Sequence, residues 1–157
     1  MIEAVLNRIK SILDGEIATG GRLETVKMVQ IGDYKEPAAT MYPYIAIHCE
    51  GIDFDGFNNP SSAMLTVNGS IIIYVSSLAS IEAVERARDN LLWEDRTGKP
   101  PAGVLPTLLK NLVQFEITPN KYFMDIGTVR REVTGEKSKF IAGAEIPFVV
   151  KTHRQII

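Results

Sequence analysis

The chain has 157 residues, of which 45% are hydrophobic and 23% are charged, values that suit one globular domain and exclude a disordered or fibrous chain. The formal net charge of -2 and the sequence pI near 5.7 argue against sequence-specific nucleic-acid binding, which needs excess lysine and arginine. Cys49 is the only cysteine, so an intrachain disulfide and a cysteine-based zinc site are excluded. With no signal-peptide pattern and no run of roughly 20 apolar residues, we expect neither secretion nor membrane insertion.

The first fourteen residues predict an amphipathic helix that ends at Gly15. Their apolar side chains recur at helical spacing, at Ile2, Val5, Leu6, Ile9, Ile12 and Leu13. After the flexible Gly20-Gly21 pair, Leu23 to Ile31 predicts a strand because it is rich in β-branched and apolar residues.

Two further strands are predicted on either side of a long loop. The segment 33–41 has no periodicity, and the following 42–49 is rich in strand formers, with Ile45, Ile47 and Cys49 on one face. Gly51 to Ser62 concentrates turn-forming residues and predicts the loop. Met64 to Ser76 alternates as a long central strand whose inward residues are Leu65, Val67, Gly69, Ile71, Ile73 and Val75.

Two helices are expected next. Ser77 or Ser80 can cap a helix that extends to Trp93, and its inward stripe is predicted as Ile81, Val84, Ala87, Leu91 and Leu92. The proline- and glycine-rich segment 95–103 ends this helix. A shorter helix follows, with apolar residues at Val104, Leu105, Leu108, Leu109 and Leu112.

Strand-like segments complete the chain at 115–118, 121–133 and 139–152. The element order predicts a single α+β domain over residues 1–157. In this fold, one mixed or mostly antiparallel sheet carries the N-terminal amphipathic helix, the long helix and the short helix on one face.

No pattern in the sequence predicts catalysis, a metal or a cofactor. The glycines lack the lysine and the spacing of a phosphate loop. Asp53 and Asp55 resemble the start of a calcium loop, but Phe57, Asn58 and Met64 occupy positions that need a ligand, a glycine and a glutamate. The chain is therefore expected not to be an enzyme and to need no cofactor.

The predicted contact residues with other proteins lie in two segments. Phe54 and Phe57 lie in a polar loop, where they either fold back onto a local core or are covered by a partner. A basic segment near the C-terminal end is either a solvated hairpin or a contact for phosphate or protein. The candidate contact residues are Asp53, Phe54, Asp55, Phe57, Asn58, Arg130, Arg131, Lys137 and Lys139.

The order, length and composition of these elements resemble those of the tail terminator and tail-completion proteins of long-tailed bacteriophages. The resemblance covers most of the chain and rests on four features: the opening amphipathic helix, the strand YPYIAI, the long strand that leads into the helix at Ser80, and the closing FIAGAEIPFVVKTHRQI. It includes no catalytic or ligand motif.

That resemblance implies a ring-forming virion protein, usually a hexamer, at the tail end or neck. The ring would cap the last ring of tail-tube subunits, stop tube growth and join the head connector, or the sheath in contractile tails, with DNA passing through its lumen. The protein would be made in the cytoplasm of the host bacterium.

Two alternatives stay open. A neighbouring head-to-tail connector or neck protein would have a similar size and fold but a different docking surface. A small hydrolase-type enzyme would gather His48, Asp53, Asp55 and His153 in three dimensions.

Overall fold

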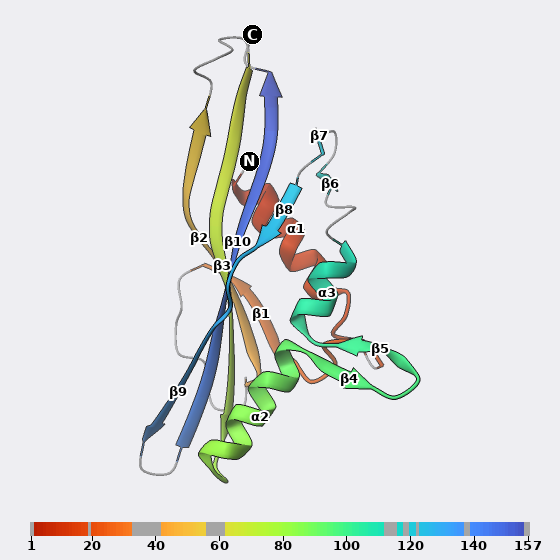
Figure 1. Ribbon diagram of the computed structural model, residues 1–157, viewed down its shortest axis with the longest axis vertical. Helices are drawn as coiled ribbons and strands as arrows, with labels where there is room; N and C mark the ends of the chain where they lie inside the picture. The colour runs from red at the N-terminus through yellow and green to blue at the C-terminus, as the bar shows by residue number, and fades with distance from the viewer. Residues whose placement is uncertain are drawn as a thin grey trace.

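The computed structural model describes residues 2–18, 20–32, 42–55, 62–111, 116–117, 120–121, 123–136 and 139–155. In this part of the chain, one six-stranded sheet carries the helices on a single face (Figure 1). The helices are α1 (Ile2–Asp14), α2 (Ile81–Leu92) and α3 (Val104–Asn111). The sheet strands are β1 (Met28–Ile31), β2 (Tyr44–Asp55), β3 (Ser62–Ser77), β8 (Phe123–Ile126), β9 (Arg130–Glu136) and β10 (Lys139–Gln155).

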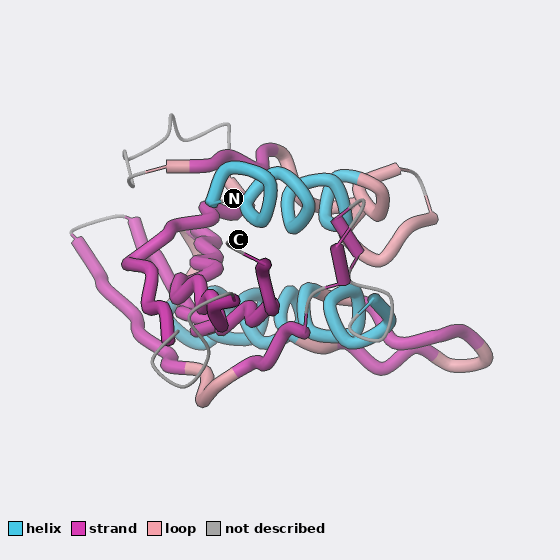
Figure 2. Tube along the Cα trace, turned by 90° about the horizontal axis from the view of Figure 1, so that it is seen from above, coloured by secondary structure: helices cyan, strands magenta, loops and turns pink. Residues whose placement is uncertain are grey.

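The strands follow the order β1-β2-β3-β10-β8, and β9 also pairs with β10. The β1–β2 pair is parallel and the other pairs are antiparallel. The predicted α+β class, with a mixed and mostly antiparallel sheet, is therefore confirmed. Two small hairpins lie outside this sheet: β4 (Glu94–Arg96) with β5 (Lys99–Ala102), and β6 (Glu116–Ile117) with β7 (Asn120–Lys121). Figure 2 shows β4–β5 projecting away from the main sheet.

The core lies between the three helices and the inner face of the sheet. The predicted stripe of α1 is confirmed, because Val5, Leu6, Ile9, Ile12 and Leu13 are all buried. In β3 and β10, residues that face the helices alternate with residues on the outer face, as the period of a strand requires. The helix-facing residues are Val67, Gly69, Ile71, Ile73 and Val75 on β3 and Ala142, Ala144, Ile146, Phe148 and Val150 on β10. These two long strands form the centre of the fold.

Gly69 is needed where β3 passes the Phe148 ring. A Cβ at this position would lie 2.3 Å from the backbone oxygen of His48 and 2.5 Å from Phe148 Cζ. Both neighbours are held in the sheet, so a side chain at Gly69 would force strands apart.

The predicted loop from Gly51 to Ser62 is wrong in part, because β2 continues to Asp55 and β3 already begins at Ser62. Turn-forming residues adopt strand geometry here because β3 pairs with them from Gly51↔Asn68 to Asp55↔Met64. A bulge between Cys49 and Gly51 makes Glu50 the extra residue. Cys49 is half-buried and packs with Ile45 and Ile47 against the core, as predicted.

The predicted strands 23–31 and 121–133 also need correction. The first begins only at Met28, after a turn that buries Leu23. The second is interrupted between Ile126 and Arg130, and both pieces, β8 and β9, pair with the same side of β10. The gap lies beside Pro147, which has no N–H to offer, although its carbonyl accepts from Gly127 N at 2.9 Å.

The helix α2 has its predicted cap, but its inner stripe differs from the prediction. Ser80 Oγ accepts a hydrogen bond from Ala83 N at 3.0 Å. Ile81 and Ala87 were predicted to point inward, yet both are exposed, and Arg88 is buried instead. The segment 95–103, predicted as a simple break, contains most of the β4–β5 hairpin. The predicted short helix is confirmed as α3, and Leu112 lies outside the described residues.

Candidate functional site

The predicted contact residues lie in two separate parts of the sheet (Figure 1). One group belongs to the end of β2 and the other to the β9–β10 hairpin. Phe57, Asn58 and Lys137 lie outside the described residues. Among the described candidates, one copy of the chain keeps the two groups apart.

In the β2 group, Asp53 lies on the outer face of the sheet, away from the helices. Its Oδ2 atom accepts a hydrogen bond from Asn68 Nδ2 at 2.9 Å. Phe54 and Asp55 are paired through their backbones with Leu65 and Met64, so they belong to a strand and not to a loop. Their side chains lie outside the described part of the structure.

In the second group, Arg130 and Arg131 point to opposite faces because they are neighbours in β9. Arg131 faces the helices, and its Nε and Nη2 atoms donate to the two carboxylate oxygens of Asp89 at 3.1 and 2.8 Å. Arg130 is exposed on the outer face, opposite Glu145 in the strand register, and forms no ion pair within the described residues. Lys139 begins β10 opposite Glu136.

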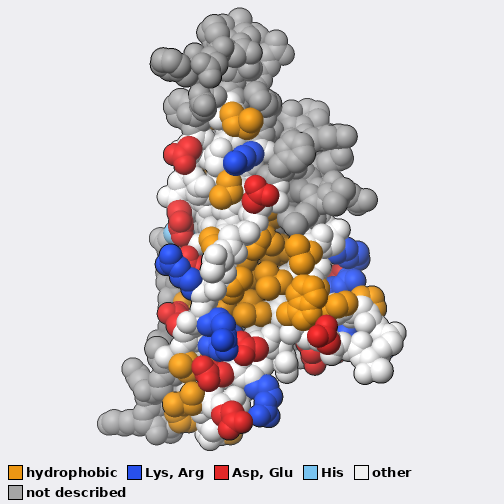
Figure 3. All heavy atoms as spheres, in the orientation of Figure 1, with side chains coloured by type: hydrophobic (Ala, Val, Ile, Leu, Met, Phe, Trp, Pro, Cys, Tyr) orange, Lys and Arg blue, Asp and Glu red, His pale blue; other side chains and the backbone are white. Residues whose placement is uncertain are grey.

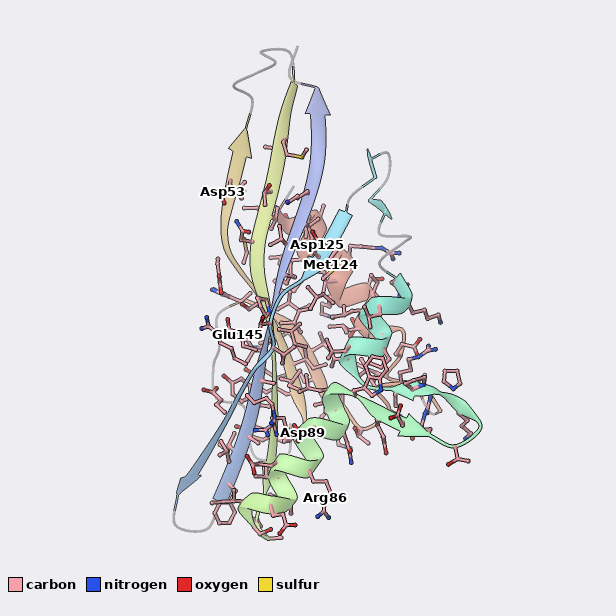
Figure 4. All side chains as sticks on the ribbon, in the orientation of Figure 1. Asp53, Arg86, Asp89, Met124, Asp125 and Glu145 are labelled. Carbon is pink, nitrogen blue, oxygen red and sulfur yellow. The ribbon has the colours of Figure 1, made fainter. Side chains whose placement is uncertain are left out.

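Arg88 joins α2 to β9 and is 1% exposed. Its Nη1 atom donates to the backbone oxygen of Glu132 at 2.9 Å, and its Nε atom donates to Asp89 Oδ1 at 3.2 Å. Asp89, labelled on α2 in Figure 4, therefore holds two arginines, Arg88 from the helix and Arg131 from the edge strand. We did not predict this network from the sequence, although the helical spacing of Val84, Arg88 and Leu91 places the arginine on the inner side.

Two carboxylates meet a buried hydroxyl on the outer face. Ser70 is 1% exposed, and its Oγ atom lies 2.8 Å from Glu50 Oε1 and 3.0 Å from Glu145 Oε1. The three residues come from β2, β3 and β10, so the cluster connects the central strands. The bulge at Glu50 brings this side chain to Ser70, and this pairing detail was not visible in the sequence.

An apolar patch lies between the β8–β9 edge and α3, where Figure 3 shows hydrophobic side chains in the middle of the visible face. Trp93 is 42% and Leu109 is 47% exposed, and Leu105, Ile126 and Val129 are half-buried. The indole Nε1 of Trp93 donates to Asp95 Oδ1 at 3.0 Å, which orients the ring. Ordered aromatic side chains on an apolar surface suit contact with another protein.

A cavity of about 430 Å³ lies between α2, the β4–β5 hairpin and the turn before β1. Two arginines that line it are held by the hairpin, since Arg22 Nε donates to Pro101 O at 3.2 Å and Arg96 Nη2 donates to Pro100 O at 2.8 Å. Burial raises the pKa of Glu16, but hydrogen bonds and charge from Arg22 outweigh it and leave that pKa below its ordinary value. Hydrogen bonds within the chain therefore hold Arg22 and Arg96 in the wall of the cavity.

Of the four residues of the enzyme alternative, the side chains of His48 and Asp53 are described and those of Asp55 and His153 are not. His48 and Asp53 belong to β2, whereas His153 belongs to β10 and is separated from β2 by β3. Among the described residues, no group of three or more histidine, cysteine or acidic side chains is placed to hold a metal ion. No helix in that part of the chain is both long and apolar enough to span a bilayer.

The class that the structure defines is an α+β protein with one open sheet, helices on one face, and on the other face the Ser70 cluster and a second buried cluster that contains Tyr42, Tyr44 and Ala46. No model of a known family and no curated protein matches the chain. Among solved structures, a chain from the "Virion of native gene transfer agent (GTA) particle" is similar, with a TM-score of 0.52, 7% sequence identity and coverage of 93% of this chain and 92% of that chain. At this identity, the likeness concerns the fold.

Proposed function

We propose that the chain is a structural protein of a phage-like particle, and specifically a tail terminator. The observation that carries this proposal is the shared fold with a gene transfer agent virion chain, which spans nearly the full length of both chains. The resemblance of the element order to tail terminators supports the finer assignment. The protein would act by contact with other proteins and not by catalysis.

The proposed working form is a ring of identical copies, six in the family that the chain resembles. A ring built from one repeated head-to-tail contact closes on itself and uses two different surfaces of each copy. An open sheet with distinct edges supplies two such surfaces. The ring would cap the tail tube, stop its elongation and leave a lumen for DNA.

The proposed partners are the tail-tube protein on one side and the head connector or sheath protein on the other. The end of β2 and the tip of the β9–β10 hairpin lie at opposite ends of the sheet (Figure 1). Surfaces at opposite ends suit a protein that joins two different structures. The protein would therefore be found at the tail end or neck of the virion.

A connector or neck protein is the second candidate, because the likeness to a gene transfer agent virion chain concerns the fold and does not distinguish between virion components. The position of the protein separates the two roles. A terminator is present at the upper end of isolated tails that lack heads, whereas a connector leaves with the head. Immunogold labelling of such tails distinguishes the two outcomes.

The test of the ring is solution mass with negative-stain imaging, alone and with purified tail-tube protein. We expect closed rings, either free or on tube ends, and tubes that stop growing when the protein is added. A protein that stays monomeric and leaves tube growth unchanged under both conditions would refute the proposal.

A further inference from the structure

The sheet has two open edges in the part of the chain that the structure describes. On one side, β1 pairs with β2 only as far as Ile47, so the outer edge of β2 from Gly51 to Asp55 faces no described strand. On the other side, β8 and β9 have β10 as their only described partner. Open edges present unpaired backbone groups to another strand.

These edges lie at the same height along the sheet. Ile52 is in register with Val67, Val67 with Val150, and Val150 with Met124, which gives one lateral row from β2 to β8. The strand directions also match, because three successive antiparallel pairings make β2 antiparallel to β8. A second copy rotated about an axis along the strands therefore brings its β2 beside β8 in antiparallel orientation.

The backbone groups at this height point outward from both edges. The Ile47 carbonyl faces away from β3, where it accepts from Gly32 N at 3.0 Å. Ile47 is paired with Ile71 and Ile52 with Val67, and these two partners are four residues apart on β3. Backbone groups alternate in direction along a strand, so an even separation gives the N–H and C=O of Ile52 the same orientation as those of Ile47, away from β3.

On β8, Gly127 donates its N–H to Pro147 on β10. Strand backbone groups alternate in direction, so the N–H and C=O of Met124, three residues earlier, face away from β10. Ile52 of one copy and Met124 of another can thus form a backbone-paired row.

The side chains favour the pairing of Ile52 with Met124 over a pairing shifted along the strand. Ile52 is 39% exposed and lies on the helix-facing side of the sheet, the same side as Met124 and Ile126. A shift of one residue would reverse the faces. A shift of two residues would pair Ile52 with Ile126 and place Asp53 directly against Asp125, two like charges (Figure 4).

Charge complementarity on the outer face supports the same register. Asp53 lies in the lateral row of Thr66 and Lys151. Lys151 is exposed and forms no ion pair within the described residues. In the Ile52–Met124 register, Phe123 of the next copy lies beside Asp53, and Lys151 of that copy lies one strand further, about 10 Å from Asp53 between backbones. Asp53 has the same separation from Lys151 of its own chain, so the added copy would place a second lysine on the other side of this carboxylate.

We propose that a second copy of this chain adds its β2 edge to the β8 edge in antiparallel pairing, with Ile52 opposite Met124 and Asp53 facing Lys151. This inference rests on the proposed ring and names the two edges that would build it. The main sheet would continue from copy to copy, with the acidic outer face of one β2 edge beside the lysine of its neighbour.

The first test is disulfide cross-linking in a Cys49→Ala background, which removes the single native cysteine. Three double variants are compared after mild oxidation: I52C/M124C, I52C/I126C and the control I52C/D125C. Within one chain, three strand spacings of about 4.8 Å separate these positions, beyond the Cα separation of about 7 Å that a disulfide tolerates. Any disulfide between them therefore joins two copies.

We expect I52C/M124C to give a ladder of linked copies and I52C/D125C, whose second cysteine is on the other face, to give little. Native mass spectrometry of the same reduced samples, with and without tube protein, reports assembly independently of cross-linking. Oligomers that cross-link no better in I52C/M124C than in the control would overturn the proposed edges and leave the ring intact. Monomers under both conditions would overturn both proposals.

A charge exchange supplies a second test that does not depend on a buried substitution. Asp53→Lys and Lys151→Asp should each weaken assembly several-fold, and the combined variant should restore it. Unchanged assembly in both single variants, or no recovery in the combination, would refute the Asp53–Lys151 contact. Thermal unfolding of each variant verifies that the monomer remains folded.

Discussion

Replacement of Arg88 by methionine tests whether polar contacts of the buried arginine hold α2 against β9. The guanidinium donates to the Glu132 backbone oxygen at 2.9 Å and to Asp89 at 3.2 Å. Methionine retains an apolar chain of similar reach, so the buried stem is largely replaced and the polar contacts are lost.

The expected cost is about 2 kcal/mol in the free energy of unfolding, the value of one hydrogen bond that involves a charged group, about 1.5–3 kcal/mol. The bond to the Glu132 backbone oxygen carries this cost, because the bond to Asp89 is to a carboxylate that is 45% exposed. Arg88 Nη2 also lies 3.6 Å from Glu85 Oε1. The cost stays below that of a fully buried broken pair, because Asp89 is 45% and Glu85 is 41% exposed and both remain hydrated without the arginine. The matched control is Arg86→Met on the same helix. Its pair with Glu82 is 69% and 83% exposed, so the expected change is about 0–0.5 kcal/mol.

Urea unfolding of the wild type and both variants measures the difference, and calorimetry should show a lower Tm by about 4–8 °C for Arg88→Met. Equal losses in the two variants would contradict the role of the buried network. A more stable Arg88→Met variant would show that desolvation of the arginine outweighs its hydrogen bonds.

Two further predictions concern the sheet and the turn after α1. Gly69→Ala should lower the free energy of unfolding in urea by about 1–3 kcal/mol, because the new Cβ meets the Phe148 ring and backbone atoms. The control Gly51→Ala should change it little, because a Cβ there has no atom within 4 Å. Equal effects would refute the packing argument. Glu16→Gln should destabilise at neutral pH, since Arg22 lowers the pKa of Glu16 below 4.5. A lowered folded-state pKa gives stability that is present above the ordinary pKa and lost as pH falls through the lowered one, so the difference between wild type and variant should shrink in acid; a difference that grows in acid would contradict this.

Much of the fold could be predicted because its signals are local. The helical repeat of Val5, Ile9 and Leu13 defines the buried side of α1 without any other part of the chain. The two-residue repeat of Ile71, Ile73 and Val75 likewise defines the inner face of β3.

The errors occurred where long-range pairing overrides local preference. Gly51 to Asp55 has the composition of a loop, yet β3 holds it in a strand. The edge strand 121–133 has a continuous strand-like composition, yet Pro147 on β10 lies beside its interruption. Neither effect can be inferred from the affected segment alone.

The sequence by itself determined the buried side of α1 and the inner face of β3, because helix and strand periods depend only on nearby residues. It also located Asp53 and Arg130 as candidate contacts. Only the tertiary structure decided that Arg88 is buried between α2 and β9, that Glu50 reaches Ser70 across a bulge, and that Ile52 and Met124 end one lateral row at two open edges. The physical reason is that register, edge and burial are set by strands far apart in the sequence, which meet only when the sheet forms.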